Sequence, residues 1–416
     1  MLRRVVVTGL GAVSPNGIGQ REFWENTCKG ISGIDRITSF DPVNLACQIA
    51  GEVTNFDPSL YYSSADLKKL PRTVPLAVAA TQEALTSAGI DLGSFSEEDF
   101  ESLGVLDGSG GSGFDFSEKQ FEIYFSQHKN KISPYAISNS LVGMLSSEIS
   151  MRFGFQGRSH VISNGCTSST DALGYAFNTI RHGQEDWFVS GGVESCVTPA
   201  MMQGFERMKV NPINYNDDPS RGSRPFNRDR EGFVLAEGCW MIILEELEHA
   251  KKRGANIVAE LVGYGTTCDA YHRVAIMPDG KQSTRALRLA LKDARTNEDE
   301  VDYINFHGTS TLINDKVETM AVKNTFNGKA MNIPSSSTKS MIGHPQGASG
   351  ALGVTVSALS LKNGFMTPTI NMENPDPECD MDYVSNFGRE KRINVAISNC
   401  ISFGSKNSAI VLKRFE

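Results

Sequence analysis

The chain has 416 residues, 40% of them hydrophobic, and its 48 acidic and 40 basic side chains leave a formal net charge of -8. This length suits one large globular unit or two closely packed halves, and the acidic balance argues against a nucleic-acid-binding protein. No apolar run approaches the roughly 18 residues of a membrane span. The eight cysteines are scattered without a CxxC pair, so we expect no disulfide framework, no metal site and a reducing, cytoplasmic location.

Apolar runs of strand length alternate with helix-like segments, which predicts an α/β fold. The opening MLRRVVVTGLGAVSPNG contains Gly11 and Pro15 inside its apolar part, so it indicates a buried strand and turn and not a signal peptide. RRVVVTGL, DWFVSGGV and WMIILEEL are further strand candidates. Apolar spacing predicts helices over residues 75–89 and 283–294.

The chain contains two segments of similar pattern, VVVTGLGAVSPNG at its start and VAELVGYGTTCDAY from residue 258. Each is a strand followed by glycines, and each half then reaches a surface helix, which favours an internal repeat. We expect one half over residues 1–250 and a second over residues 251–416. The polar segment 211–232 is expected to be an ordered surface loop.

Cys166 lies in SNGCTSSTDA, after a short predicted strand and before a helix predicted to end at Gly183. At such a strand-to-helix elbow, free N–H groups and the helix dipole are expected to lower the pKa of the thiol. The thiolate is then a candidate nucleophile that forms a thioester. A small buried core cysteine is the alternative.

Two loops carry candidate histidines. VDYINFHGTST predicts a buried strand that delivers His307 to a loop, where it either faces a cleft or is a satisfied structural histidine. STKSMIGHPQGASG places Lys339 and His344 in a Gly- and Ser-rich loop before a helix expected over residues 348–364. NCISFGSKNSAIVL predicts two strands joined by a tight turn at Gly404, which can offer a backbone N–H to an oxyanion.

The chain resembles the β-ketoacyl-acyl-carrier-protein synthases, the elongating condensing enzymes of the thiolase fold, over essentially its whole length. Three motifs carry the resemblance in the family's order and at its spacing: the cysteine elbow, HGTST with the following DKVE, and STKSMIGH. The resemblance implies a thiolase-like fold, with two related halves in a five-layered α-β-α-β-α arrangement.

The resemblance also implies roles for the site residues. Cys166 takes an acyl chain from its carrier as a thioester, while His307 and His344 flank a malonyl thioester and favour loss of CO2. The resulting carbanion attacks the acyl thioester, so the implied activity is a decarboxylative Claisen condensation that gives a 3-oxoacyl-carrier protein. Lys339 is implied to pair with Glu318 and organise the site.

Further implied residues handle the oxyanion and the carrier. Backbone N–H groups of Cys166 and Phe403 form the oxyanion hole, and Phe403 is also the gating phenylalanine. Thr309 and Thr311 bind the phosphopantetheine arm of an acyl carrier protein, and the enzyme has no cofactor of its own. Two basic clusters are candidate docking sites for the acidic carrier, with solvated surface charge as the alternative: Lys68, Lys69, Arg72, Arg207 and Lys209.

The family is dimeric, so the HVISN strand is expected at a two-fold interface. The dimer is either a homodimer or a heterodimer with a related chain-length-factor subunit, and neither nucleic acid nor membrane is an expected partner. Thiolase and a non-catalytic chain-length factor remain minor alternatives, and Cys400 is the residue that a thiolase interpretation needs. A buried core thiol is the favoured interpretation of Cys400.

Two segments depart from the family pattern. Asn164-Gly165-Cys166 replaces Thr or Ala before Ala-Cys, and Ile401-Ser402-Phe403-Gly404-Ser405-Lys406-Asn407 replaces Phe-Gly-Phe-Gly-Gly-x-Asn. Loss of two glycines is expected to stiffen the terminal loop. These departures favour a specialised synthase, such as the ketosynthase of an aromatic or polyene type II polyketide pathway, with fatty-acid elongation as the alternative.

Overall fold

An eleven-stranded mixed sheet is the frame of the computed structural model, which describes residues 2–126 and 131–416. The strand order is β11-β10-β14-β15-β9-β1-β8-β7-β5-β6, and β2 pairs with β1 outside this path. The strands of the first half are β1 (Val5–Ser14), β2 (Gly17–Ile18), β5 (Gly104–Gly108), β6 (Ser159–Ile162), β7 (Trp187–Glu194) and β8 (Gly238–Glu246). Those of the second half are β9 (Ala259–Cys268), β10 (Tyr303–Asn305), β11 (Ser335–Ser336), β14 (Val395–Ser402) and β15 (Lys406–Lys413).

The two halves of the sheet repeat one pairing scheme. In the first half β1, β8 and β7 pair antiparallel in turn, and β7, β5 and β6 pair parallel. In the second half β9, β15 and β14 pair antiparallel, and β14, β10 and β11 pair parallel. The halves join where Val5–Val7 of β1 pairs with β9. The expected internal repeat is therefore confirmed, while its boundary at residue 250 stays a prediction.

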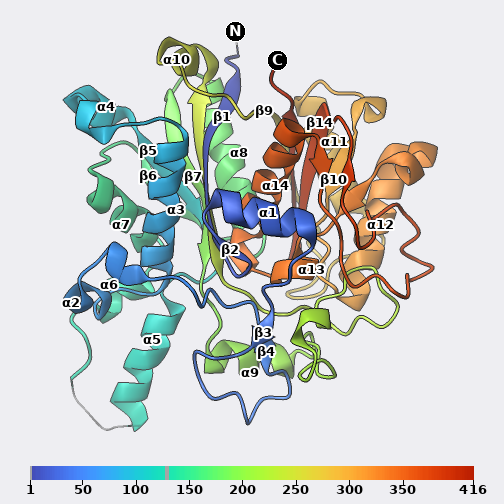
Figure 1. Cartoon of the computed structure of the whole chain (residues 1–416), viewed down its shortest axis with the longest axis horizontal. Helices are drawn as coiled ribbons and strands as arrows, with labels where there is room; N and C mark the ends of the chain where they lie inside the picture. Colours follow the sequence, from blue (N-terminus) through green and yellow to red (C-terminus); the bar gives the residue numbers. More distant parts are fainter. Residues whose placement is uncertain (1, 127–130) are drawn as a thin grey trace.

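Helices cover both halves of the sheet and fill the space between them. Helices α8 (Ser168–Arg181) and α14 (Ser349–Asn363) contact each other and strands of both halves, so they form the central layer (Figure 1). Helices α3 (Thr73–Ser87) and α7 (Met144–Phe153) cover the outer face of the first half, and α11 (Lys281–Asp293) and α12 (Leu312–Phe326) that of the second. This is the expected five-layered arrangement.

Paired glycines bring one outer helix close to each half of the sheet. A Cβ at Gly9 or Gly11 of β1 would lie 2.2 or 1.9 Å from carbonyl oxygens of α3. A Cβ at Gly263 or Gly265 of β9 would lie 2.4 or 2.3 Å from carbonyl oxygens of α11. The similar GLG and GYG segments therefore have the same physical role in both halves, because only glycine permits this approach of helix to strand.

The loop over residues 211–232 differs from the expectation of a surface loop. Its centre is buried, with Arg224 1% and Phe226 0% exposed. The Phe226 ring stacks on Tyr383 with ring centroids 3.8 Å apart and meets Phe306 edge-on at 5.5 Å. Phe306 directly precedes His307. The loop therefore packs, through Phe226, against the segment that carries a candidate site residue.

The other elements are shorter and connect the main layers. The remaining helices are α1 (Gln20–Lys29), α2 (Ser64–Leu67), α4 (Glu97–Ser102), α5 (Phe114–Phe121), α6 (Ala136–Ser140), α9 (Pro199–Arg207), α10 (Leu247–Lys252) and α13 (Lys339–Ile342). Two small sheets pair β3 (Asp35–Arg36) with β4 (Ile49–Ala50) and β12 (Phe365–Met366) with β13 (Arg389–Glu390). Within residues 2–126 and 131–416, none of the helices is long and apolar enough to cross a bilayer.

Candidate active site

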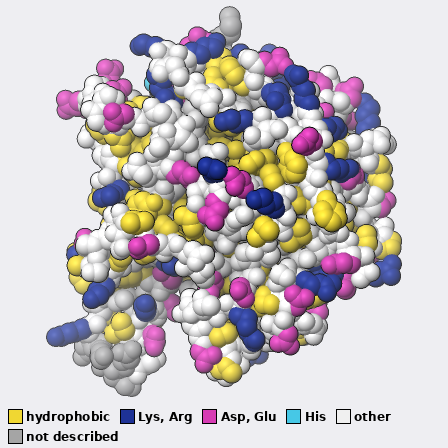
Figure 2. All heavy atoms as spheres, viewed as in Figure 1, with side chains coloured by type: hydrophobic (Ala, Val, Ile, Leu, Met, Phe, Trp, Pro, Cys, Tyr) yellow, Lys and Arg dark blue, Asp and Glu magenta, His cyan; other side chains and the backbone are white. Residues whose placement is uncertain are grey.

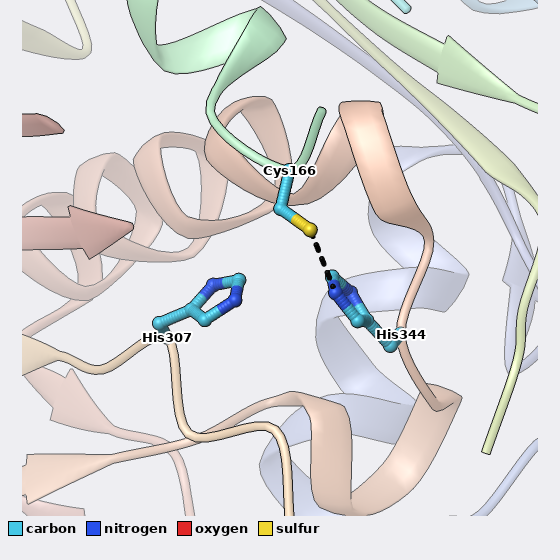
Figure 3. Close-up of side chains that lie close together, drawn as sticks. All are labelled: Cys166, His307 and His344. Atoms are coloured by element: carbon cyan, nitrogen blue, oxygen red, sulfur yellow. Dashed lines mark hydrogen bonds between the residues drawn. The ribbon is translucent and has the colours of Figure 1, made fainter. Parts of the chain in front are cut away.

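Three residues far apart in sequence meet at one buried point. The Cys166 sulfur lies 3.1 Å from Nε2 of His344, and the His307 and His344 rings are 5.1 Å apart at 85° (Figure 3). The sulfur and one nitrogen of each ring all lie within 4.8 Å of one another. All three side chains are at most 3% exposed. The sequence-predicted set of one cysteine and two loop histidines is therefore assembled in the fold.

Cys166 lies at the predicted elbow between β6 and α8. Gly165 takes a left-handed φ of +67°, and α8 begins two residues after the cysteine, at Ser168. Its sulfur faces the two imidazoles (Figure 3). The chain can turn sharply here because glycine adopts positive φ without a steric cost.

The pKa of the Cys166 thiol corrects the expectation from the helix dipole. Burial raises this pKa to about 11, and the polar groups of Ser402 and the Phe403 backbone, with the nearby Lys339 charge, only partly oppose it. Desolvation disfavours the charged thiolate, and here it outweighs the elbow's N–H groups. The resting nucleophile is therefore a thiol, which must lose its proton as it reacts.

His307 follows β10, and its backbone is held in place by Glu318. The N–H groups of His307 and Gly308 donate to the Glu318 carboxylate at 2.7 and 2.8 Å, and Asn399 donates to the same carboxylate at 2.7 Å. Glu318 lies on α12 and is fully buried. It therefore fixes the start of the HGTST turn, and with it the direction of the imidazole.

His344 is fixed by a residue that the sequence motifs did not single out. The Ser349 hydroxyl lies 3.0 Å from Nδ1 of His344, at the first turn of α14. The hydroxyl and Nδ1 can exchange donor and acceptor roles with the ring tautomer. In the tautomer in which Ser349 donates, the ring proton is on Nε2, the nitrogen that lies 3.1 Å from the Cys166 sulfur. Burial and the Lys339 charge hold the pKa of both His307 and His344 well below the usual value. Both rings are therefore neutral near pH 7, with one N–H each.

The expected pairing of Lys339 with Glu318 stays a prediction. Glu318 accepts backbone and amide N–H groups, and no direct ion pair joins the two residues in the described chain, but the Glu318 charge raises the pKa of Lys339 against the effect of burial. Lys339 is 4% exposed, and burial lowers its pKa. Its charge acts at longer range, where it lowers the pKa of both histidines.

The turn between β14 and β15 closes one side of the site. Phe403 is half-buried, and its ring centroid lies 6.3 Å from that of Phe233. The Phe233 ring in turn meets the His344 ring edge-on, with centroids 5.1 Å apart. The Cys400 sulfur, buried in β14 as expected of a core thiol, lies 3.1 Å from the Cys166 carbonyl oxygen and 3.4 Å from Nδ1 of His307. Sequence reasoning treated Cys400 as packing alone and missed its contact with His307.

The remaining predicted residues fall in two groups. Thr309 and Thr311 lie 3.0 Å apart through their hydroxyls at the start of α12, close to His307 in sequence. Lys68, Arg207 and Lys209 are exposed, and on the face of Figure 2 basic and acidic side chains are intermixed. Arg72 differs from the expectation, because it forms a two-pronged ion pair with the buried Glu237 at 2.7 Å.

Comparisons with known proteins agree with this geometry. The family model described as beta-ketoacyl synthase, N-terminal domain, matches residues 2–250, and its C-terminal domain matches residues 258–373. A 3-oxoacyl-acyl-carrier-protein synthase 2 from Synechocystis sp. is 39% identical over 100% of this chain and 99% of its own length. The enzyme of the same name from Coxiella burnetii is 39% identical over 99% of both chains.

Solved ketosynthases superpose on the whole chain. A type II PKS acyl-carrier protein in complex with its ketosynthase bound to the hexaketide matches with a TM-score of 0.92 and 32% identity, covering 100% of both chains. The ishigamide ketosynthase/chain length factor matches with a TM-score of 0.90, 30% identity and the same coverage. With a thiolase-like fold, an assembled cysteine and histidine site and relatives along its full length, this chain belongs to the beta-ketoacyl synthase family and is a ketosynthase.

Proposed function

We propose that the chain joins an acyl chain held on Cys166 to a malonyl unit on an acyl carrier protein, with loss of CO2, to give a 3-oxoacyl-carrier protein. Cys166 first takes the acyl group from a carrier thioester, and the free carrier thiol departs. The malonyl thioester then loses CO2, and its α-carbon attacks the acyl carbon as the Cys166 sulfur leaves. The sulfur regains a proton, which returns the enzyme to its starting state.

The observation that carries this proposal is the pair of neutral imidazoles opposite the buried sulfur. Loss of CO2 builds negative charge on the malonyl thioester oxygen, and two N–H donors in a water-poor site stabilise charge where it develops. The low pKa of both rings keeps them neutral donors. Hydrolysis by a cysteine–histidine pair needs only one imidazole, so the second ring favours decarboxylation.

Supporting groups complete the proposed site. The N–H groups of Cys166 and Phe403 form the oxyanion hole for the acyl thioester, and Thr309 and Thr311 bind the phosphopantetheine arm of the carrier. Glu318 and Lys339 act on the histidines through position and charge. Lys68, Lys69, Arg207 and Lys209 remain the proposed docking residues for an acidic carrier, whereas Arg72 is held by Glu237.

The direct test supplies acyl- and malonyl-carrier proteins and measures CO2, the adduct on Cys166 and the product mass. We expect one CO2 for each malonyl unit added to the 3-oxoacyl-carrier protein, no adduct in Cys166→Ala, and CO2 release at least 100-fold slower in His307→Ala or His344→Ala. Condensation of two acyl thioesters without a malonyl unit would instead indicate a thiolase. Absence of any adduct on intact protein would indicate a non-catalytic subunit.

For the pathway, we infer type II polyketide synthesis, with fatty-acid elongation as the alternative. Polyketide synthesis is supported by the altered segments around Cys166 and Phe403 and by the likeness to two solved ketosynthases. Fatty-acid elongation is supported by the curated relatives named 3-oxoacyl-acyl-carrier-protein synthase 2. The measurement is the number of malonyl units added when no reductase is present. Several units per chain support polyketide synthesis, and one unit supports the alternative.

A two-fold dimer through β6 is also proposed, as a homodimer or with a related chain-length-factor subunit. β6 is one of the two edge strands of the sheet, and its residues are half-buried or exposed in the single chain. An open edge offers backbone groups to a partner strand. Sedimentation of the purified chain, 45.3 kDa as a monomer, with and without candidate partner subunits separates the two forms.

A further inference from the structure

One N–H group that the proposed oxyanion hole needs is already occupied. The backbone N–H of Cys166 donates to the Ser402 hydroxyl at 2.8 Å, inside the buried site. The same hydroxyl lies 3.0 Å from the Asn164 carbonyl oxygen and 2.9 Å from the Phe403 carbonyl oxygen, to one of which it donates. Ser402 therefore bridges the terminal turn and the cysteine elbow with a closed set of hydrogen bonds.

The position of Ser402 depends on the absence of a side chain at residue 165. A Cβ on Gly165 would lie 2.4 Å from the Ser402 oxygen, well inside van der Waals contact. The next nearest atom, the Phe403 carbonyl oxygen, would be an ordinary contact at 3.6 Å. The two departures from the family pattern, Gly165 and Ser402, are thus a spatial pair, because the small residue at one position makes room for the hydroxyl at the other.

A second contact joins the same two segments. The Lys406 ammonium donates to the Asn164 side-chain oxygen at 3.2 Å, and the Asn164 amide donates to Asp171 of α8 at 2.9 Å. The terminal turn is therefore attached to the elbow on both sides of Phe403, through Ser402 before it and Lys406 after it.

We propose that Ser402 closes the oxyanion hole of the acyl-free enzyme, with Gly165 providing the room, and that the incoming acyl thioester opens it by displacing the hydroxyl from the Cys166 N–H. This rests on the proposed function. Ser402 is a positioning residue and does not itself touch the reacting carbon. Its hydroxyl competes with the substrate for the N–H, and so it slows acyl transfer while it keeps the buried N–H satisfied between turnovers.

The step concerned is acyl transfer to the cysteine. The Cys166 sulfur forms a bond to the acyl carbon. The carbonyl oxygen of the acyl group takes up negative charge and accepts a hydrogen bond from the Cys166 N–H. The bond to the carrier sulfur then breaks, and the proton lost by Cys166 leaves with the carrier thiol. Only this oxygen needs the N–H that Ser402 holds, whereas alkylation of the sulfur by iodoacetamide passes through no oxyanion.

The first test compares these two reactions in Ser402→Ala. Acyl transfer from an acyl-carrier protein and alkylation by iodoacetamide are both followed by mass spectrometry of the Cys166 peptide. We expect the ratio of the acylation rate to the alkylation rate to rise about fivefold, the worth of one neutral hydrogen bond. A purely structural effect of the substitution changes both rates together, so an unchanged or lower ratio overturns the proposal.

The second test is a double-mutant cycle. Gly165→Ala is expected to lower the urea midpoint of unfolding in the parent chain, and to lower it less than half as much in the Ser402→Gly background, because the clashing hydroxyl is then absent. The strain of a positive φ at alanine is present in both backgrounds and cancels. Equal losses in the two backgrounds overturn the spatial pairing. If the parent enzyme forms no acyl adduct at all, the proposed function fails, which is a different result from a parent that loads normally.

Discussion

At the scale of single residues, burial sets the protonation states on which the proposed chemistry depends. It raises the pKa of Cys166 to about 11 and lowers those of His307 and His344, so that the site holds a thiol and two neutral imidazoles. A neutral imidazole donates a hydrogen bond without attracting the malonyl carboxylate as an ion pair would. The same desolvation that disfavours the thiolate therefore favours decarboxylation.

The pH dependence of thiol alkylation tests the raised pKa. Below a pKa of about 11 the thiolate fraction of Cys166 rises tenfold with each pH unit. We expect its alkylation by iodoacetamide to rise about tenfold per unit from pH 7 to pH 9, measured on the Cys166 peptide. The Cys268→Ser variant removes the exposed competing thiol. A rate that levels off below pH 8 contradicts the prediction.

Glu318 provides a second test at this scale. Its carboxylate accepts the N–H groups of His307 and Gly308 and the Asn399 amide. In Glu318→Gln one acceptor becomes a donor that faces a buried donor, which costs about 1–3 kcal/mol of unfolding free energy. We expect that loss in urea titration, together with CO2 release at least tenfold slower.

The matched control for Glu318 is the exposed Glu378, which forms an ion pair with Lys316 at the surface. Glu378→Gln makes the same side-chain change at an exposed position outside the hydrogen-bonded turn, so its unfolding free energy should change by less than about 0.5 kcal/mol. Equal effects of the two substitutions would show that Glu318 does not position the HGTST turn.

At the scale of elements, the repeated glycine pairs explain why two strands of unlike overall sequence have the same neighbours. The GLG segment of β1 receives α3, and the GYG segment of β9 receives α11. Each approach brings helix carbonyl oxygens to the strand backbone. The central helices α8 and α14 begin just after Cys166 and His344, at Ser168 and Ser349, and contact each other, which brings these two site residues together from the two halves.

Substitution of one of these glycines tests the packing. A Cβ at Gly11 would lie 1.9 Å from the Ala80 carbonyl oxygen, so Gly11→Ala must displace α3 or the strand. We expect a loss of about 3 kcal/mol of unfolding free energy, at the upper end of overpacking effects. Gly204→Ala in α9 is the control, because a Cβ there meets nothing within 4 Å and alanine stabilises helices. A neutral Gly11→Ala would contradict this account.

At the scale of the whole molecule, a net charge of -8 repels an acidic protein, so the proposed binding of an acidic carrier depends on a local basic surface. The exposed residues Lys68, Arg207 and Lys209 are available for this, and Lys69 is exposed beside Asp66, with which it pairs at 2.9 Å. An exposed ion pair contributes little to the free energy of folding, so a bound partner can replace it at small cost. Arg72 is not available in this way, because both prongs of its guanidinium are bound to Glu237.

Charge reversal tests separately whether the cluster of Lys68 and Lys69 or that of Arg207 and Lys209 binds the carrier. If Lys68 and Lys69 dock the carrier, Lys68→Glu/Lys69→Glu weakens carrier binding at least tenfold at low salt and reduces its salt dependence. The measurement is calorimetric titration with acyl-carrier protein, with Arg207→Glu/Lys209→Glu as the parallel variant. Unchanged affinity in the first double variant moves the docking site away from α2, and unchanged affinity in both removes both assignments.

Local order along the chain was enough to predict the alternation of strands and helices, the repeat and the three motif-bearing loops. These features depend on neighbouring residues, such as the apolar spacing of α3, α11 and α14 and the glycines Gly89 and Gly364 that follow α3 and α14. Cys166, His307 and His344 could be named for the same reason, because each belongs to a local pattern at a strand end or before a helix.

Only the tertiary structure decided the pKa of Cys166, the partner of Glu318, the ion pair of Arg72 and the contact between Gly165 and Ser402. Each depends on a residue distant in sequence or on the degree of burial, and desolvation acts only after the layers have closed. The dipole of α8 is a local property, which the sequence revealed, whereas the exclusion of water that outweighs it belongs to the packed whole.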